Sequence, residues 1–291
     1  MEKAKPLRWP PRSAPYLPLT SLLHHMTTIF RTLAAGFTVI AAVAPVAVQA
    51  QSNPDKITLC HSHEEAYPWL INGKPGYSAL MMQSIEKQLG VAIKLAPMPW
   101  KQCMAEVKSG TMDGAINASF AADRAEFAVY PVKLDGESDA TKRMYRATYA
   151  LYRIKGSAAG WDGQKLTGVD GTIGAPTGYS VIAQLTKLGA KVDDSANATG
   201  EILKRLAAGR YQLVALQTTE ADDTLHAEAD LRAKVERINP PLAEKPYFTI
   251  FSKVFYAKYG PTAKEVWKLE GKTRDSAEFK GQVAHLVKSV D

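Results

Sequence analysis

The sequence predicts an α/β protein with a two-lobed architecture, in which each lobe is a mostly parallel sheet flanked by helices and two hinge strands join the lobes. Short apolar runs alternate with amphipathic helical segments, and this alternating series occurs twice along the chain. Two long extended segments, at 143–157 and 246–255, follow the two series. The residues from 51 to 291 suffice for two lobes of about 100 to 150 residues each.

The first series has the order strand, helix, strand, helix, strand. Each expected helix is amphipathic and ends at a glycine, the residue that most readily adopts the left-handed conformation of a helix end. We expect strands at 56–60, 91–99 and 114–119 and helices at 78–90 and 100–110.

The second series repeats this alternation after the extended segment 143–157. Two helical stretches then follow the second extended segment and complete the chain. We expect strands at 171–180, 190–195 and 211–217 and helices at 181–189, 200–209, 261–274 and 276–290.

The net charge of +7 is concentrated at the start of the chain. Residues 1–50 hold five basic residues and one acidic residue, whereas the remainder holds 31 basic and 28 acidic residues. This mild excess contains no basic run and no nucleic-acid-binding motif, so we expect no nucleic-acid partner.

The first 50 residues are typical of a targeting segment. From Met26 a short stretch with Arg31 precedes an apolar run and then Val48-Gln49-Ala50, which suits cleavage after Ala50. We therefore expect Met26 as the initiator, a cleaved signal peptide and a periplasmic mature protein. An uncleaved signal anchor is the alternative.

Cys60 and Cys103 are the only two cysteines. In an oxidising compartment, two cysteines with no third candidate are expected to form one disulfide. A catalytic cysteine is the weaker alternative, because neither residue lies in a nucleophile motif.

In its order of motifs, the chain resembles the type II periplasmic substrate-binding proteins, in the solute-binding family 3 that includes polar amino-acid binders. The resemblance covers residues 55–291 and rests on Tyr67-Pro68-Trp69 with Gly76 and on the segments 107–131, 171–180 and 206–217. It implies that the C-terminal helices return to the first lobe. Lobe 1 would then comprise 51–148 plus 250–291, and lobe 2 would comprise 149–249.

The resemblance implies a role for Arg124, which follows a strand that ends in Asn117 and Ser119. In the family, an arginine at this place grips the carboxylate of the ligand. A guanidinium is suited to this because its planar fork of donors pairs with both carboxylate oxygens. The alternative is a surface ion pair of Arg124 with Asp123 or Glu126.

A second anion contact is implied at Thr177, Gly178, Tyr179 and Ser180. Family members place a turn of small hydroxyl residues here, at a helix start whose amides favour an anion. Tyr179 departs from that pattern and is expected to cap or narrow the pocket. An ordinary helix N-cap by Ser180 is the alternative.

Aromatic walls are implied by Trp100 and by the first loop, which holds Tyr67 and Trp69. Aromatic faces can cover an apolar or cationic part of a ligand. The alternative for each tryptophan is a buried core residue.

The chain departs from the family where an acid usually holds the ligand's ammonium group. Gln217 aligns there, Gln212 replaces an earlier aspartate, and Ala66 stands where an aromatic residue is expected. Gln217 accepts a hydrogen bond but supplies no charge. Glu220 is the alternative contact.

His61, His63, Glu64 and Glu65 lie close together in the first loop. A metal site is one interpretation, but no third ligand of suitable spacing follows. We expect no metal and no cofactor, and we place His63 in a polar rim that contacts the ligand.

These features predict a monomeric solute receptor that closes two lobes on a small carboxylate-bearing molecule and docks on a membrane ABC permease. The hinge is expected near 149–151 and 248–250. A receptor for a membrane sensor protein is the alternative. A cyclohexadienyl dehydratase-like enzyme, with Glu65 or Glu220 as its acid, is a third hypothesis, although we expect no enzymatic activity.

Overall fold

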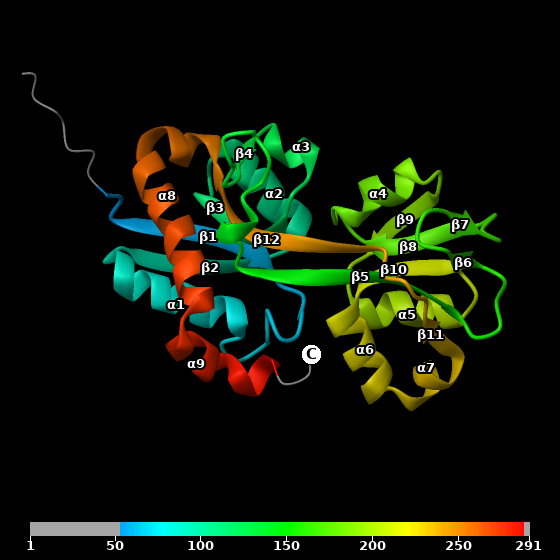
Figure 1. The fold of residues 1–291 in the computed structure, drawn as a ribbon. Coiled ribbons are helices and arrows are strands. Elements are labelled where there is room, and N and C mark those ends of the chain that lie inside the picture. Colours follow the sequence, from blue (N-terminus) through cyan, green and yellow to red (C-terminus); the bar gives the residue numbers. More distant parts are fainter. Residues whose placement is uncertain (1–52, 288–291) are drawn as a thin grey trace, which may run out of the picture. The chain divides into compact units, whose positions relative to one another are not determined.

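A single ten-stranded β-sheet organises residues 53–287, the part of the chain that the computed structural model describes (Figure 1). Its main path has the strand order β2-β1-β3-β12-β5-β10-β8-β9, while β11 pairs with β5 and β4 pairs with β12. These strands are β1 (Lys56–Ser62), β2 (Ala92–Met98), β3 (Gly114–Ser119), β4 (Ala128–Val129), β5 (Tyr145–Ile154), β8 (Thr172–Pro176), β9 (Lys191–Ala196), β10 (Leu213–Gln217), β11 (Val235–Arg237) and β12 (Ala243–Ser252). A separate two-stranded sheet pairs β6 (Gly160–Trp161) with β7 (Leu166–Thr167).

The sheet contains two parallel groups that are connected through two antiparallel strands. Strands β2, β1 and β3 are parallel to one another, as are β10, β8 and β9. Strands β5 and β12 pair with each other through residues 145–149 and 243–247, and each then continues into one of the parallel groups. Figure 1 shows these two long strands running from one group of elements to the other. The predicted fold class is therefore confirmed.

Helices flank both parallel groups. Figure 1 shows α1, α2, α8 and α9 around β1–β3, and α4, α5, α6 and α7 around β8–β10. The helices are α1 (Tyr77–Leu89), α2 (Trp100–Ser109), α3 (Ala122–Ala125), α4 (Val181–Lys187), α5 (Thr199–Ala207), α6 (Thr218–Ala227), α7 (Ala229–Lys234), α8 (Lys253–Asp275) and α9 (Ala277–Val287), with a 3₁₀ turn at Ala140–Lys142.

The predicted ends of the first two helices are confirmed. Gly90 follows α1 with a φ of 69°, and Gly110 follows α2 with a φ of 80°. Both residues are in the left-handed region, where glycine has no steric penalty. Each glycine N–H donates to a carbonyl of the preceding helix, which ends the helix at the position expected from the sequence.

The structure contains short strands that were not predicted, namely β4, β6, β7 and β11, and it differs from the predictions at two further segments. The extended segment expected at 246–255 ends at Ser252, because the Ser252 hydroxyl accepts a hydrogen bond from Phe255 N and caps α8 at that point. Helix α8 thus begins eight residues before Pro261, with non-helical dihedrals at Tyr259 accommodating the proline. Helices α6 and α7 were not predicted, because the segment is dominated by polar residues.

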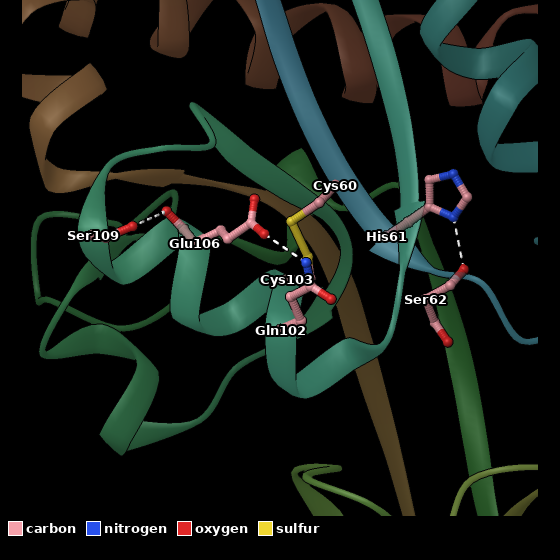
Figure 2. The surroundings of a disulfide bond; sticks show 7 residues. All are labelled: Cys60, His61, Ser62, Gln102, Cys103, Glu106 and Ser109. Carbon is pink, nitrogen blue, oxygen red and sulfur yellow. Dashed lines mark hydrogen bonds between the residues drawn. A yellow bond between two sulfur atoms is a disulfide. The ribbon is translucent and has the colours of Figure 1, made fainter.

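The disulfide between Cys60 and Cys103 is confirmed (Figure 2). It joins β1 to α2 across a sequence separation of 43 residues, and both cysteines are fully buried. Trp100 lies at the first position of α2, so the bond anchors the helix that presents this residue to the cavity described below. The described residues contain no free cysteine.

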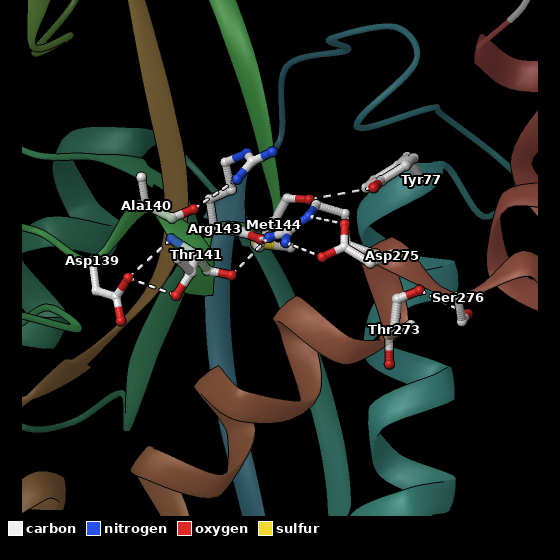
Figure 3. A network of polar contacts seen from close by, with 10 residues as sticks. Tyr77, Asp139, Ala140, Thr141, Arg143, Met144, Thr273, Asp275 and Ser276 are labelled. Atoms are coloured by element: carbon white, nitrogen blue, oxygen red, sulfur yellow. Dashed lines mark hydrogen bonds and ion pairs between the residues drawn. The ribbon is translucent and has the colours of Figure 1, made fainter.

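The end of α8 is fastened to the segment that enters β5 (Figure 3). The Arg274 guanidinium donates hydrogen bonds to the carbonyls of Thr141 and Arg143 and pairs with Asp275. From α1, the Tyr77 hydroxyl donates to the Met144 carbonyl at 3.3 Å. Helix α8 also packs against α1, so the C-terminal helices lie with the first parallel group.

The predictions about the initiator Met26, the signal peptide and its cleavage after Ala50 fall outside the described residues. Within 53–287, none of the helices combines the length and the apolar character that crossing a bilayer requires.

Candidate functional site

A cavity lies where the strands of both parallel groups end. It offers about 30 Å³ to the centres of water-sized molecules. The cavity is bordered by the ends of β3, β10, α2, α4 and α6. Tyrosines of β5 and β12 also contribute to its wall. Its lining residues are Ser62, Ala66, Leu70, Trp100, Asn117, Ser119, Arg124, Tyr145, Tyr179, Ser180, Gln217, Glu220 and Tyr247.

Arg124 faces this cavity and is only 5% exposed. Its Nη1 donates to the Ser119 carbonyl at 2.8 Å and its Nη2 donates to the Gly178 carbonyl at 2.7 Å. The guanidinium also lies over the Trp100 ring, 5.3 Å from the ring centroid. Among residues 53–287 no carboxylate pairs with Arg124, so neither Asp123 nor Glu126 neutralises this buried charge, and the surface ion pair considered as an alternative is not formed.

Ser119 and Ser180 are in direct contact at the same cavity wall. Their hydroxyl oxygens lie 2.7 Å apart, and the Lys245 ammonium donates to both the hydroxyl and the carbonyl oxygen of Ser180 at 3.1 Å. The Ser180 side chain therefore does not cap α4, although the residue occupies the cap position. Burial and then the nearby Arg124 charge lower the pKa of Lys245 to about 8.

Trp100 and Asn117 each present a buried donor that has no partner in the protein. Trp100 is 7% exposed, and its Nε1–H makes no hydrogen bond. Asn117 adopts a φ of 60°, a left-handed conformation that asparagine tolerates. Its Oδ1 accepts a hydrogen bond from the Ser78 hydroxyl at 2.7 Å, which leaves Nδ2 without a partner.

Gln217 and Glu220 present the acceptors of the cavity. Gln217 Nε2 donates to the Tyr247 hydroxyl at 2.9 Å, while Gln217 Oε1 has no partner. Glu220 Oε2 accepts a hydrogen bond from Thr199, and its buried Oε1 has no partner. Burial raises the pKa of Glu220 to about 7, against the opposing effect of the Thr199 hydrogen bond.

Three aromatic rings form a stack at the cavity wall and in the adjoining core. Trp69 lies parallel to Tyr145 at 3.7 Å between centroids, and Tyr145 lies parallel to Tyr247 at 5.0 Å. Tyr145 and Tyr247 line the cavity, whereas Trp69 does not and is 4% exposed. Trp69 is therefore a buried core residue, which was the alternative considered for it. Trp100 is buried and also lines the cavity.

Several residues predicted for the site lie beside this cavity rather than in its wall. The Thr177 hydroxyl donates to the carbonyls of Asp194 and Ala196, and Gly178 N donates to Asp194 Oδ2 at 3.2 Å. His63 pairs with Glu64 at 3.1 Å. Tyr67 donates its hydroxyl to the carbonyl of Leu286 at 3.0 Å. Roles of Thr177, Gly178, His63 and Tyr67 in ligand binding stay predictions.

The sequence did not point to Tyr145, Tyr247 or Lys245. Strand periodicity places Tyr145 and Tyr149 on the same face of β5, but only the pairing of β5 with β12 shows which face meets the cavity. Ala66, which aligned with an expected aromatic residue, does line the cavity. Within the described part of the chain, no group of three or more potential ligands is arranged to hold a metal ion.

The fold and this cavity define a class of protein: the chain has the fold of the type II periplasmic binding proteins. No protein-family model matches the chain, and no curated protein matches its sequence. The chain is therefore similar to these proteins in structure and not in a detectable sequence match.

Three solved structures illustrate this likeness. A histidine kinase sensor domain with similarity to periplasmic binding proteins has a TM-score of 0.62 at 14% identity, over 80% of this chain and 96% of that one. The ligand-binding core of GluR0 from Nostoc punctiforme, in complex with L-glutamate, has a TM-score of 0.59 at 15% identity, over 80% and 99%. The amino acid ABC transporter substrate-binding protein AbpA from Streptococcus pneumoniae, bound to L-arginine, has a TM-score of 0.58 at 18% identity, over 81% and 95%.

Proposed function

We propose that this protein is a periplasmic solute-binding receptor that captures a small carboxylate-bearing ligand, an amino acid or related organic acid, and delivers it to an ABC-type permease. One observation carries the proposal: a buried, unpaired guanidinium shares a cavity with four buried polar atoms that have no partner in the protein. These atoms are Trp100 Nε1, Asn117 Nδ2, Gln217 Oε1 and Glu220 Oε1.

The chemistry of these atoms fits a zwitterion. An unsatisfied buried polar group costs about 1–3 kcal/mol, and more if it is charged, so each favours a ligand that completes its hydrogen bond. A carboxylate satisfies Arg124 and the N–H donors of Trp100 and Asn117. An ammonium group satisfies the acceptor oxygens of Gln217 and Glu220.

Ligand entry requires the two halves to separate. The cavity offers only about 30 Å³, and contacts between the two halves lie at its wall, including Arg124 with Gly178 and Ser119 with Ser180. We assign the halves to 51–148 plus 250–291 and to 149–249, with the hinge in β5 and β12. Closure is then driven by contacts that the ligand makes with both halves at once.

The turn at Thr177 and Gly178 has a secondary part in this proposal. Its donors bind Asp194 and Ala196 in the present conformation. A ligand carboxylate on the Arg124 side would compete with Asp194 for the Gly178 amide. Thr177 and Gly178 can therefore bind a ligand anion only if they give up their present hydrogen bonds to Ala196 and Asp194.

A thermal-shift titration with a panel of small acids and amino acids tests the proposal. We expect one class of carboxylate to raise the melting temperature of the wild type, and Arg124→Ala to lose this shift. Arg146→Ala is the matched control, because Arg146 is exposed and pairs with Glu244 on β12. An undiminished shift in Arg124→Ala would remove Arg124 from the site and overturn the proposal.

A receptor for a membrane sensor protein is the second candidate, and it is favoured by the likeness to a histidine kinase sensor domain. Transport and signalling would both use the same ligand site and the same closure of a monomer. Affinity capture of membrane proteins by the liganded protein separates them: transport predicts a permease, and signalling predicts a sensor. The neighbours described above are binding proteins and a sensor domain, which favours binding over the dehydratase hypothesis.

A further inference from the structure

Lys245 places a second cation next to the cavity. It is half-buried on β12, and no carboxylate of residues 53–287 lies within ion-pair distance of its ammonium group, as is also true of Arg124. Burial lowers the pKa of Lys245, and the charge of Arg124 lowers it further, to about 8. The two cations are therefore close enough to repel each other, and an anion near both relieves that repulsion.

The ammonium group of Lys245 fixes the role of the Ser180 hydroxyl. An ammonium group has three N–H donors and no acceptor. Two of these donors go to Ser180, one to the hydroxyl and one to the carbonyl oxygen, each at 3.1 Å, and Nζ also lies over the Tyr149 ring at 5.8 Å from its centroid. Ser180 Oγ must therefore accept a hydrogen bond from Lys245.

The direction of the next hydrogen bond follows from this. Ser119 Oγ lies 2.7 Å from Ser180 Oγ, and Ser180 is 8% exposed. Within the described part of the chain, the hydrogen-bond contacts of Ser180 Oγ are with Lys245 and Ser119. Lys245 cannot accept, so the single hydrogen of the Ser180 hydroxyl goes to Ser119 Oγ, because a buried donor left unpaired costs about 1–3 kcal/mol.

The hydrogen of the Ser119 hydroxyl is then available to a third acceptor. Ser119 lines the cavity, and Arg124 Nη1 donates to its carbonyl at 2.8 Å. In the unliganded protein Tyr247 can accept this hydrogen, since it is opposite Ser119 in the register of β3 and β12. An anion bound by Arg124 lies beside the same hydroxyl and is the stronger acceptor, because it is charged.

We propose that Lys245 is a positioning residue for ligand binding, which orients the hydroxyls of Ser180 and Ser119 so that Ser119 donates to the ligand carboxylate. The proposal rests on the proposed function. Lys245 is not among the residues that line the cavity, so it acts through the two serines and through its charge.

This role makes affinity depend on pH. A neutral amine has a lone pair and can accept the hydrogen of Ser180, which reverses the direction of the hydrogen bonds. A ligand carboxylate favours the charged form of Lys245. Affinity is therefore complete below the pKa of about 8 and declines as the pH rises above it.

The other titratable groups around Lys245 do not produce this decline. The buried tyrosines on β5, on β12 and before α4 stay neutral, because burial raises the pKa values of Tyr145, Tyr149, Tyr179 and Tyr247. Glu244, beside Lys245 on β12, pairs with Arg146. Glu220, whose pKa burial raises to about 7, acts in the opposite direction, because its ionisation strengthens binding of an ammonium group.

The test measures affinity by isothermal titration calorimetry for the wild type, Lys245→Met and Lys245→Arg. The probes are L-glutamate, L-glutamine and L-arginine, and the one that binds the wild type most tightly is used throughout, from about pH 7 to about pH 9. Lys191→Met is the matched control, at an exposed lysine on β9 that does not line the cavity. The melting temperature of each unliganded variant reports whether it folds.

We expect Lys245→Met to bind about tenfold more weakly than the wild type at about pH 7, and Lys191→Met to bind as the wild type does. Lys245→Arg keeps a charged donor, so it should retain most of the affinity. The affinity of the wild type relative to Lys245→Arg should fall as the pH rises to about 9, because titrations of the probe and of Glu220 cancel in this ratio.

A second comparison separates positioning from a merely structural role. Ser119→Ala should weaken binding less in the Lys245→Met background than in the wild type, although Lys245 donates to Ser180 and not to Ser119.

Equal affinities of the wild type and Lys245→Met, or a ratio of wild type to Lys245→Arg that does not change with pH, would overturn the inference. The proposed function would stand if Arg124→Ala still lost binding. The pH comparison needs only the wild type and the conservative variant, so it decides the question even if Lys245→Met does not fold. Binding of none of the three probes would overturn the inference together with the proposal of an amino-acid ligand.

Discussion

Ser119 Oγ and Ser180 Oγ lie 2.7 Å apart, which places the end of β3 in hydrogen-bond contact with the start of α4. The two residues are 61 positions apart in the sequence. Lys245, from β12, donates to the same Ser180 hydroxyl. The two serines thus connect the two parallel groups of the sheet next to the guanidinium of Arg124, which has no ion-pair partner within residues 53–287.

A double-mutant cycle measures this contact. We expect the single variants Ser119→Ala and Ser180→Ala each to lower the free energy of unfolding, because each removes one hydrogen bond of a buried hydroxyl. Their coupling energy in urea denaturation should be about 0.5–1.5 kcal/mol. Strictly additive effects would mean that the hydroxyls do not interact in solution.

The disulfide between Cys60 and Cys103 should contribute strongly to stability. In the chain-entropy model, closing a loop of this length stabilises the folded state by about 4 kcal/mol. We therefore expect Cys60→Ser, Cys103→Ser to have a much lower midpoint of urea denaturation than the oxidised wild type. The reducing agent dithiothreitol should move the wild type toward the variant and leave the variant unchanged, and a midpoint of the variant equal to that of the wild type would refute the bond.

Glu270 should make stability depend on pH. Its side chain is fully buried on α8, one oxygen accepts from Thr249 and the other has no partner, and burial raises its pKa from 4.5 to about 8. Folding then favours the neutral acid. The resulting stability is complete below pH 4.5, declines as the pH rises to about 8 and is constant above that.

Replacing this acid by a neutral isostere isolates the effect. We expect Glu270→Gln to remove the decline between pH 4.5 and 8, measured as the free energy of unfolding in urea at a series of pH values. Glu265→Gln, at a partly exposed acid on the same helix that pairs with Lys268, should keep the wild-type profile. An identical decline in Glu270→Gln would show that another group causes it.

Ligand binding should release a proton from Glu220. Burial raises the pKa of this carboxyl to about 7 in the present structure, and an adjacent ligand ammonium favours the charged form and lowers that pKa again. Affinity should therefore increase as the pH rises through 7. Calorimetry in buffers of different ionisation enthalpy should detect the proton at pH 7 in the wild type and not in Glu220→Gln, and uptake of a proton would contradict this assignment.

Part of the candidate site could be predicted from the order of strands and helices along the sequence. Asn117 and Ser119 end one parallel strand, Arg124 follows it, and Gln217 ends another. The fold class alone therefore brings them to one edge of the sheet. All of them line the cavity, as do Trp100, Tyr179 and Ser180.

The remaining parts depend on tertiary pairing that the sequence does not encode locally. Tyr145 and Tyr247 meet because β5 and β12 pair antiparallel in one register. Lys245 reaches Ser180 through the same register. The 218–234 segment was missed because its helices bury few apolar residues, including Ala221, Leu225 and Leu231.

A carboxamide analogue of the ligand tests whether Arg124 binds the ligand carboxylate. Calorimetric affinities are compared for the best-bound amino acid and for its carboxamide, which has the same shape without the negative charge. We expect the wild type to bind the carboxylate at least about a hundredfold more tightly than the carboxamide, and Arg124→Ala to bind the two equally weakly. Equal affinity of the wild type for the acid and for its carboxamide would contradict a carboxylate held by Arg124.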